Sequence, residues 1–406
     1  MKRLHADFLL TCDPHMRIIK NGAIVFDKTI VALGEASAMA ERYPNATPIE
    51  APNSVILPGL VNPHVHLEFS ANQGLLHFGS FVPWLNSVIA HREALQEAAT
   101  QEVIEGAIAT MLHSGITTFG AISSFGRELE ACAATPARVV LFTELLGSRP
   151  DAVDILFEDF KQRLRQAFEL ENNRFRAALS IHSPYSTHPI LAKNGLDIAR
   201  KEGLLVSTHF MESQAERDWL DGKGGEFAAF FNAFSPYAKP LHNGLSYLAL
   251  FQDTQPLFTH AVHATEEELD AIKALGGGIT HCPVSNRMLG TGAFNLSRVL
   301  EREIPLTLGT DGLSSNITLS LWEEMRHALF AHPAIELHTL ARTLLHSATA
   351  GGANALRLNG GVLEEGKAAD LLVMPLQGAR EENLPLHLIL HATAPSHVYI
   401  EGERVC

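Results

Sequence analysis

Cysteine is scarce in this chain of 406 residues, and its four cysteines stand far apart. They are Cys12, Cys132, Cys282 and Cys406, and no two of them form a C-x-x-C pair. Disulfide-stabilised small domains and thiolate zinc sites both need several cysteines at characteristic spacings. Any metal site in this protein must therefore use histidine and carboxylate ligands.

Positive charge is also in short supply. Lysine and arginine number 31 against 45 aspartate and glutamate residues, which gives a net charge of −14 and a pI near 5.8. Nucleic-acid backbones and anionic membrane surfaces attract patches rich in lysine and arginine. We therefore expect neither nucleic acid nor a membrane as the main partner.

Long hydrophobic runs are missing as well. No apolar stretch approaches the length of about 18 residues that a membrane helix requires. The basic start Met1 to Arg3 resembles a signal peptide only briefly, because Asp7 interrupts the apolar run that follows and Asp13 with Pro14 ends it. The expected location is the cytoplasm.

The composition is that of an ordinary globular protein. Hydrophobic residues make up 46% of the chain and charged residues 19%, which is enough for one large core and a smaller appendage. We find no internal repeat, long linker or low-complexity tract.

About eight short apolar runs alternate with amphipathic segments from Leu57 onward, which is typical of β/α units. Each run is apolar at its start and polar where it ends. In an eight-stranded parallel barrel, the chemistry lies at the carboxyl ends of the strands. The sequence therefore predicts an α/β protein with a (β/α)8 TIM-like barrel. The runs are VILPGLVN (55–62), GITTFGAI (115–122), ARVVLFTELL (137–146), RFRAALSIH (174–182), GLLVSTHF (203–210), PLFTHAV (256–262), GGGITHCPV (276–284) and IPLTLGTDG (304–312).

Both chain ends have strand-and-turn character. In the first fifty residues, Asn21-Gly22 is a hairpin signal at the start of NGAIVFD. The tail, with GGVLEEGKAADLLVMPL and HVYIEGERV, is similar in pattern. We predict a composite small β domain from residues 1–56 and 361–406, with a metal-dependent barrel over residues 57–360.

Histidines gather at the predicted strand ends. His64 and His66 lie two apart, so that both rings can face one point from a strand. Taken alone, such a pair is more often solvated or hydrogen-bonded than ligating. With His209, His260 and Asp311 at later strand ends, the set offers four nitrogen donors and one oxygen donor, which suits zinc or ferrous iron. These five are the expected metal ligands, and Asp311 can also take a proton from a bound water.

Two further strand-end residues are candidate catalytic groups. Glu212 comes three residues after His209, where a carboxylate can pass a proton to the substrate. Alternatively, Glu212 is an ordinary surface glutamate at the start of a helix. His281 ends the seventh run and can hydrogen-bond a developing negative centre, although it can also be a satisfied core histidine.

With these residues in place, the chain resembles the amidohydrolase superfamily. PGLVNPHVH (58–66) is similar to its first-strand motif PG-x-x-(N/D)-x-H-x-H, LGTDG (308–312) to its last-strand aspartate motif, and GKAADLLVM (366–374) to its closing segment. The fourth strand end reads SIHSPYS, where members with two bridged metals carry a lysine. His182 at this position implies a site with one divalent metal, zinc or alternatively iron.

HFMES (209–213) and HCPVSN (281–286) resemble the branch that deaminates aminated purines. HLEFSAN (66–72), FGSFVPWLNSV (78–88), STHFMES (207–213), CPVSNRMLG (282–290) and TDGLSSNITLSLWEEMR (310–326) are similar to the aminodeoxyfutalosine deaminases of menaquinone biosynthesis. The resemblance implies hydrolytic attack at C6 of an adenine ring. Glu212 would protonate N1, His281 and Asp311 would hold the tetrahedral intermediate, and ammonia would leave.

The rest of such a nucleoside needs a hydroxyl acceptor, an aromatic wall and a cation. Glu68, Trp84 and Arg149 are the candidates, with His182 reaching the base or a ribose oxygen. Each has a structural alternative: Glu68 can cap a loop, Trp84 can be a core residue, and Arg149 can be solvated. Arg127 competes with Arg149 for a substrate carboxylate. Ser314, Ser315 and Asn316 are expected to cap the next helix rather than touch the substrate.

Other readings stay open at this stage. The nucleoside can be S-adenosylhomocysteine, 5′-methylthioadenosine or adenosine, and a guanine deaminase or a chlorohydrolase uses a similar metal site. A non-catalytic barrel is disfavoured because all five ligand positions are filled. The resemblance also suggests a homodimer.

Overall fold

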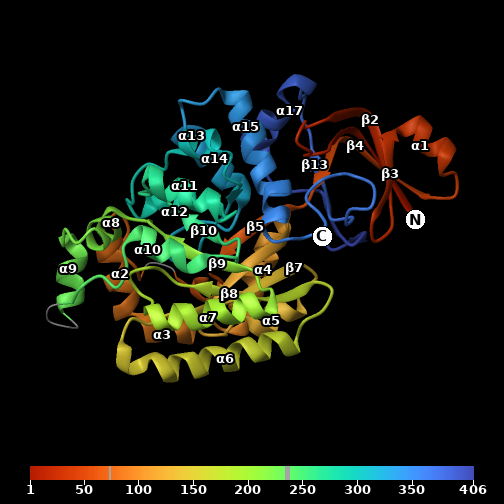
Figure 1. Cartoon of the computed structure of the whole chain (residues 1–406). Helices are drawn as coiled ribbons and strands as arrows, with labels where there is room; N and C mark the ends of the chain where they lie inside the picture. The colour runs from red at the N-terminus through yellow and green to blue at the C-terminus, as the bar shows by residue number, and fades with distance from the viewer. Residues whose placement is uncertain (73–74, 234–237) are drawn as a thin grey trace.

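A computed structural model describes residues 1–72, 75–233 and 238–406. The described chain forms two separate sheets, one of eight strands and one of seven. In Figure 1, four strands of the second sheet lie to one side of the barrel, and the N-terminus lies with them; they are β2 (Ile18–Phe26), β3 (Ile30–Glu35), β4 (Thr47–Pro58) and β13 (Leu371–Pro375).

The eight-stranded sheet is the predicted barrel. Its neighbouring strands pair in parallel and follow chain order from β5 to β12. Each strand falls on one of the eight apolar runs, because strands buried on both faces read as continuous apolar stretches. The fold class is confirmed. The strands are β5 (Leu60–Val65), β6 (Ile116–Ser123), β7 (Arg138–Leu145), β8 (Phe175–Ile181), β9 (Val206–Phe210), β10 (Leu257–His260), β11 (Gly278–His281) and β12 (Leu306–Leu308).

Side-chain hydrogen bonds help to close the barrel between its first and last strands. The amide of Asn62 in β5 donates to Thr310 Oγ1 at 2.7 Å, and its Oδ1 accepts from the Thr310 backbone N–H at 3.2 Å. One step further, the Asp311 N–H donates to the His64 carbonyl at 3.1 Å. This seam therefore brings Asp311 beside His64.

Helices surround the barrel, and many of their apolar faces join its main core. The largest fully buried side chain is that of Trp322 in α14, whose indole N–H donates to the Ser114 carbonyl. Among the described residues, no helix combines the length and the apolar character needed to cross a membrane. The helices are α2 (Phe81–Ala90), α3 (Arg92–Ala98), α4 (Gln101–His113), α5 (Leu129–Ala134), α6 (Val153–Glu169), α7 (Pro189–Glu202), α8 (Gln214–Leu220), α9 (Gly225–Asn232), α10 (Gly244–Leu248), α11 (Glu266–Ala274), α12 (Pro283–Met288), α13 (Leu296–Glu301), α14 (Leu321–Ala331), α15 (Leu337–His346), α16 (Gly352–Ala355) and α17 (Leu384–His391).

The seven-stranded sheet joins the two ends of the chain, as predicted. Its order is β15-β14-β13-β4-β1-β2-β3, so C-terminal strands pair with N-terminal ones through β13 and β4. Helix α1 (Ala36–Arg42) packs on this sheet. The strands are β1 (Lys2–Leu10), β2 (Ile18–Phe26), β3 (Ile30–Glu35), β4 (Thr47–Pro58), β13 (Leu371–Pro375), β14 (His397–Ile400) and β15 (Glu403–Arg404).

The hairpin signal at Asn21-Gly22 is wrong. Both residues lie inside β2, and pairing with β1 continues on either side, with Ala6 opposite Gly22 and Phe8 opposite Lys20. Asn21 has a φ of 45°, which asparagine tolerates better than most residues. The dipeptide therefore marks a local irregularity within the strand rather than its end.

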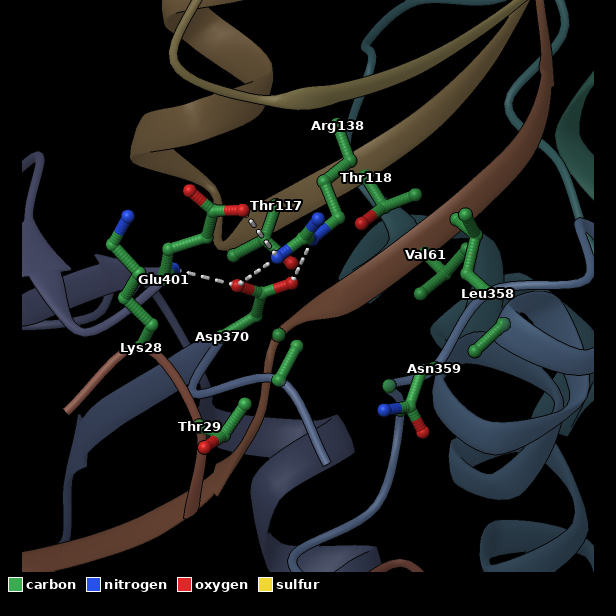
Figure 2. Close-up of a pocket in the computed structure, with 15 residues that line it drawn as sticks. Lys28, Thr29, Val61, Thr117, Thr118, Arg138, Leu358, Asn359, Asp370 and Glu401 are labelled. Atoms are coloured by element: carbon green, nitrogen blue, oxygen red, sulfur yellow. Dashed lines mark hydrogen bonds and ion pairs between the residues drawn. The ribbon is translucent and has the colours of Figure 1, made fainter. Parts of the chain in front are cut away.

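The two sheets meet at the amino end of the barrel strands. Gly59 alone separates β4 from β5, and a Cβ there would lie 2.0 Å from Thr117 Oγ1. Nearby, Arg138 at the start of β7 donates to Asp370 Oδ2 at 2.6 Å and to Glu401 Oε1 at 3.3 Å (Figure 2). These groups line a cavity of about 220 Å³. This junction fixes the small sheet against the end of the barrel opposite the histidines.

Candidate active site

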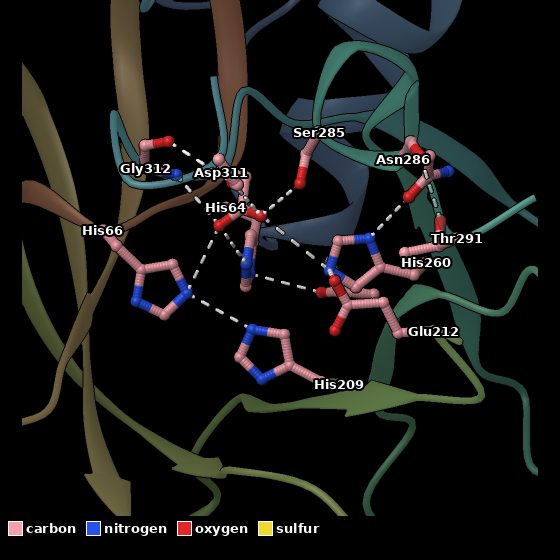
Figure 3. A network of polar contacts seen from close by, with 12 residues as sticks. His64, His66, His209, Glu212, His260, Ser285, Asn286, Thr291, Asp311 and Gly312 are labelled. Carbon is pink, nitrogen blue, oxygen red and sulfur yellow. Dashed lines mark hydrogen bonds and ion pairs between the residues drawn. The ribbon is translucent and has the colours of Figure 1, made fainter. Parts of the chain in front are cut away.

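The predicted ligand residues come together at the carboxyl end of the barrel. His64 lies in β5, His66 directly follows it, His209 lies in β9, His260 ends β10, and Asp311 follows β12. All five side chains are buried. Figure 3 shows the four rings turned toward one another, with Asp311 on one side and Glu212 beside His260.

The distances are those of a compact ligand cluster. His66 Nε2 lies 3.2 Å from His209 Nε2 and 3.6 Å from Asp311 Oδ1. His64 Nε2 lies 3.8 Å from the same Oδ1 atom. His260 Nε2 is 4.0 Å from the other oxygen, Asp311 Oδ2, and therefore lies at the edge of the cluster. Two overlapping groups, His64 with His209 and His260, and His64 with His66 and Asp311, each keep their ligand atoms within 4.8 Å of one another.

Hydrogen bonds at the far side of two rings turn their free nitrogens inward. His209 Nδ1 donates to the His182 carbonyl at 2.8 Å, and His260 Nδ1 donates to Asn286 Oδ1 at 2.9 Å. Each neutral ring then presents a bare Nε2 to the cluster. His64 Nε2 and His260 Nε2 are buried and have no hydrogen-bond partner among the described residues. Unpartnered buried ring nitrogens that converge beside a carboxylate fit a divalent metal.

Asp311 is fixed by neighbours that the sequence analysis missed. Its Oδ2 accepts from the hydroxyls of Ser285 and Ser315 at 2.7 and 2.8 Å, and its Oδ1 accepts from the Gly312 N–H. Burial alone would raise the pKa of Asp311, but the imidazoles of His66 and its neighbours lower it overall. The surroundings therefore favour the ionised form of the Asp311 carboxylate.

The expectation that residues 314–316 cap a helix is wrong. Helix α14 begins only at Leu321, with Ser320 before it. Ser315 instead holds Asp311, and the Asn316 amide donates to the Thr310 carbonyl and to Glu324. These residues shape the turn that carries the aspartate.

The backbone at the site is held in an uncommon conformation. His260 has a φ of 73°, Asp311 of 57° and Met211, next to Glu212, of 49°. Non-glycine residues in this left-handed region are strained, and such residues concentrate at functional sites. Gly312 permits a close approach as well, because a Cβ there would lie 2.9 Å from the Cβ of His66.

Glu212 lies in the cluster as a buried carboxyl group, with Oε1 at 3.5 Å from His260 Nε2. Burial, followed by the charges of Asp311 and Glu216, raises the pKa of Glu212 well above its ordinary value. Glu216 was missed from the sequence. Its two carboxylate oxygens accept from the N–H groups of Met211 and Glu212, at 3.1 and 2.8 Å. The site therefore contains a buried carboxyl group whose protonated form is favoured by its surroundings.

His182 and Trp84 lie around the cluster. The ring of His182 is 5.1 Å from that of His209 between centroids, and its Nδ1 contacts the Ser186 hydroxyl at 2.6 Å. The Trp84 indole N–H donates to the Ser314 carbonyl at 2.8 Å, and its ring packs on Phe81. Trp84 therefore ties α2 to the turn that carries Asp311.

Glu68 and Arg149 are placed differently from the expected substrate groups. The buried Glu68 carboxylate accepts from the backbone N–H groups of Ser124, Phe125 and Arg127, at 2.9 to 3.1 Å. It thus anchors the loop after β6. The side chain of Arg149 is 77% exposed and pairs with Asp151. The structure does not bring Arg149 into the cluster.

His281 is buried behind the cluster and reaches it through Asn286. Its Nδ1 lies 3.5 Å from Asn286 Nδ2, and Asn286 in turn holds His260. Asn286 and Ser285 were missed, although both lie in the HCPVSN string directly after β11. Their position after a barrel strand was the available signal.

Comparison with known proteins places the chain in a family. Residues 55–405 match the model of the amidohydrolase family. An aminodeoxyfutalosine deaminase from a Nitratiruptor species is 46% identical, over 95% of this chain and 96% of its own. An adenosine deaminase from Helicobacter pylori is 35% identical, over 98% of each. The crystal structure of Helicobacter pylori aminofutalosine deaminase in complex with methylthio-coformycin superimposes with a TM-score of 0.95, at 34% identity over the full length of both chains. The chain therefore belongs to the amidohydrolase family.

Proposed function

We propose that this protein is a metal-dependent deaminase that hydrolyses aminodeoxyfutalosine to futalosine and ammonia, a step of menaquinone biosynthesis. One observation carries the proposal: the buried carboxyl group of Glu212, whose pKa is raised, lies beside a convergent cluster of unpartnered ring nitrogens and one carboxylate. Hydrolytic deamination of a 6-aminopurine needs this combination of an activated water and a proton donor. The relatives with matching names support the substrate.

We assign one divalent metal ion to His64, His66, His209, His260 and Asp311. When bound, such an ion would lower the pKa of a water ligand to about 7 and so supply hydroxide at neutral pH. The donor set of imidazoles and a carboxylate accepts zinc or iron, and zinc is the assignment that we favour. His182 occupies the position at which two-metal relatives would need a lysine.

The chain's own residues handle the protons. Asp311 can accept the proton of the attacking water, because its carboxylate is held in the ionised form. Glu212 donates its proton to N1 of the purine, which directs the electrons of the ring toward that nitrogen. His281, through its contact with Asn286, supports the side of the site where negative charge develops.

Around the purine we assign substrate contacts to His182, whose ring lies beside that of His209, and to Trp84, which contacts the turn that carries Asp311. Glu68 remains a proposed contact, although its carboxylate is engaged with a loop. Arg149 is exposed and paired with Asp151, so of the two competing arginines we propose Arg127 for the substrate carboxylate. We also propose the domain division at residues 1–56 and 361–406 against 57–360, a cytoplasmic location and a homodimer.

The experiment offers aminodeoxyfutalosine, S-adenosylhomocysteine, 5′-methylthioadenosine and adenosine side by side to metal-replete protein. Ammonia release and the ultraviolet change from adenine to hypoxanthine are measured. We expect the highest kcat/KM for aminodeoxyfutalosine. The adenosine deaminase at 35% identity makes adenosine the main competing substrate. Inactivity on all four would overturn the proposal and favour a guanine deaminase or chlorohydrolase activity.

A further inference from the structure

A chain of side-chain contacts leads from the site to helix α14. His260 Nδ1 lies 2.9 Å from Asn286 Oδ1, and Asn286 Nδ2 lies 3.5 Å from His281 Nδ1. The other nitrogen of that ring, His281 Nε2, lies 3.0 Å from Nε2 of His332, the residue that ends α14. Four side chains from β10, α12, β11 and α14 are therefore joined in series.

The amide of Asn286 determines which atom donates and which accepts at each contact in this series of side chains. Its Oδ1 can only accept, so His260 must carry its proton on Nδ1, and its Nδ2 can only donate, so His281 must be bare at Nδ1. A neutral His281 then carries its proton on Nε2 and donates it to His332 Nε2. His332 is the terminal acceptor. The tautomers of His260 and His281 are therefore coupled, because both depend on which way the Asn286 amide points.

The surroundings keep these rings neutral and in place. The ring of His281 stacks on Phe294, with centroids 4.4 Å apart, and His332 is only 6% exposed. Burial lowers the pKa of His281 well below its ordinary value, and it lowers the pKa of His332 to about 4. The backbone of Asn286 is also held, because its carbonyl accepts from the N–H and the hydroxyl of Thr291.

We propose that His332 is a positioning residue: as terminal acceptor it fixes His281 and Asn286, and through them the tautomer of His260. The tautomer matters because it leaves His260 Nε2 bare, 3.5 Å from Glu212, where the site needs a lone pair. Without an acceptor at position 332, the N–H of His281 has no partner in a buried place. The other tautomer of His281 then becomes favourable, the amide turns, and His260 presents an N–H to the cluster.

The test compares His332→Phe, which keeps the ring shape and removes the acceptor, with His332→Gln, whose amide oxygen can take the place of Nε2. His327→Phe is the matched control, because it lies on the same helix and its Nδ1 contacts only the Glu323 carbonyl. The first readout is steady-state kinetics, and this part rests on the proposed function. The second is the tautomer of His260 in metal-free protein, from nitrogen-15 histidine correlation spectra with His260→Gln for assignment.

We expect His332→Phe to lower kcat about 10- to 100-fold with little change in KM, and to move the His260 proton from Nδ1 to Nε2. His332→Gln should keep both properties, and so should His327→Phe. Wild-type kcat and tautomer in His332→Phe would overturn the proposal, and so would an equal loss in His332→Gln. If His332→Phe does not fold, Asn286→Leu breaks the same chain one link closer and should move the same proton. If no nucleoside is deaminated, the proposed function fails. The spectra alone then decide whether His332 fixes the tautomer of His260.

Discussion

Both ends of the barrel bury charged or titratable groups, but the two ends differ in whether these groups have hydrogen-bond partners. At the amino end, Arg138 meets Asp370 and Glu401, and both oxygens of Asp370 accept hydrogen bonds. At the carboxyl end, His64 Nε2 and His260 Nε2 have no hydrogen-bond partner among the described residues. A buried polar atom is costly unless it is paired. The completed network therefore stabilises the fold, and the open one is built for a ligand.

At the carboxyl end of the barrel, buried glutamates hold the segments that surround the unpartnered ring nitrogens. Glu216 accepts two backbone N–H groups at Glu212, and Glu68 accepts three in the loop after β6. Glu324 accepts from the Val284 N–H and the Asn316 amide, on both sides of the Asp311 turn. Carboxylates that capture backbone donors of a loop fix its path. The site is thus preorganised by residues that do not face the cluster.

Glu212→Gln should have the largest effect, because it removes the proposed proton donor from the carboxyl end of the barrel. We expect kcat to fall by roughly 10²- to 10⁴-fold with metal content unchanged, since Glu212 is not one of the five residues to which we assign the metal. Elemental analysis and ammonia release measure the two quantities. Near wild-type activity in this variant would contradict the assigned role of Glu212.

Arg138→Met should instead reduce the stability of the fold, because it breaks the hydrogen-bond network at the amino end of the barrel. It leaves the buried carboxylate of Asp370 without its cation, so the free energy of unfolding should fall by roughly 3–5 kcal/mol. Denaturant titration measures this fall, and kcat at 25 °C should stay close to wild type. Arg174→Gln is the control: Arg174 is 43% exposed at 3.9 Å from Glu401, so less than about 1 kcal/mol is expected. Equal losses in both variants would argue against this contrast.

Arg127→Gln should act on substrate choice only. Glu68 holds the backbone of Arg127 at the carboxyl end of β6, and no acidic side chain in the described part of the chain pairs with its guanidinium. We expect kcat/KM for aminodeoxyfutalosine, which carries a carboxylate, to fall about tenfold or more, and that for 5′-methylthioadenosine to stay unchanged. Arg149→Gln should change neither. The reverse pattern would assign the carboxylate to Arg149.

Glu128→Gln should produce the smallest effect, on the pH dependence of stability. Burial, followed by the charge of Glu68, raises the pKa of Glu128 well above its ordinary value, so the folded protein keeps a proton that the unfolded chain loses. The free energy of unfolding of the wild type should therefore fall as the pH rises above the unfolded value near 4.5, by at most about 1.4 kcal/mol per pH unit. The glutamine variant should show a flatter profile above that pH. An identical slope in both proteins would mean that Glu128 is ionised.

The strands and the cluster could be predicted because they leave local signals. Apolar runs with polar ends identified all eight barrel strands, and the five residues predicted as metal ligands from their strand-end positions do lie together. The network around them could not be found in this way. Ser285 and Ser315 reach Asp311 through side chains, and their contacts follow no periodic pattern.

Glu68 shows how the strand rule reaches its limit. It lies two residues after His66, and alternation along a strand would keep it on the same face. The strand ends at Val65, and a short 3-10 helix, η1 (Leu67–Phe69), begins at once. The turn of this helix directs the carboxylate toward Ser124 and Phe125. Alternation holds only as far as the strand does.

The most direct test of the account is a metal titration of the carboxyl end. Metal-depleted protein is reloaded with zinc in steps, and the rate of ammonia release from aminodeoxyfutalosine is measured at each step. We predict a rate that rises linearly and levels off at one ion per chain, with the thermal unfolding temperature rising in parallel. Full activity without metal, or a plateau only at two ions per chain, would contradict the claim that the open histidine and aspartate cluster holds a single catalytic metal.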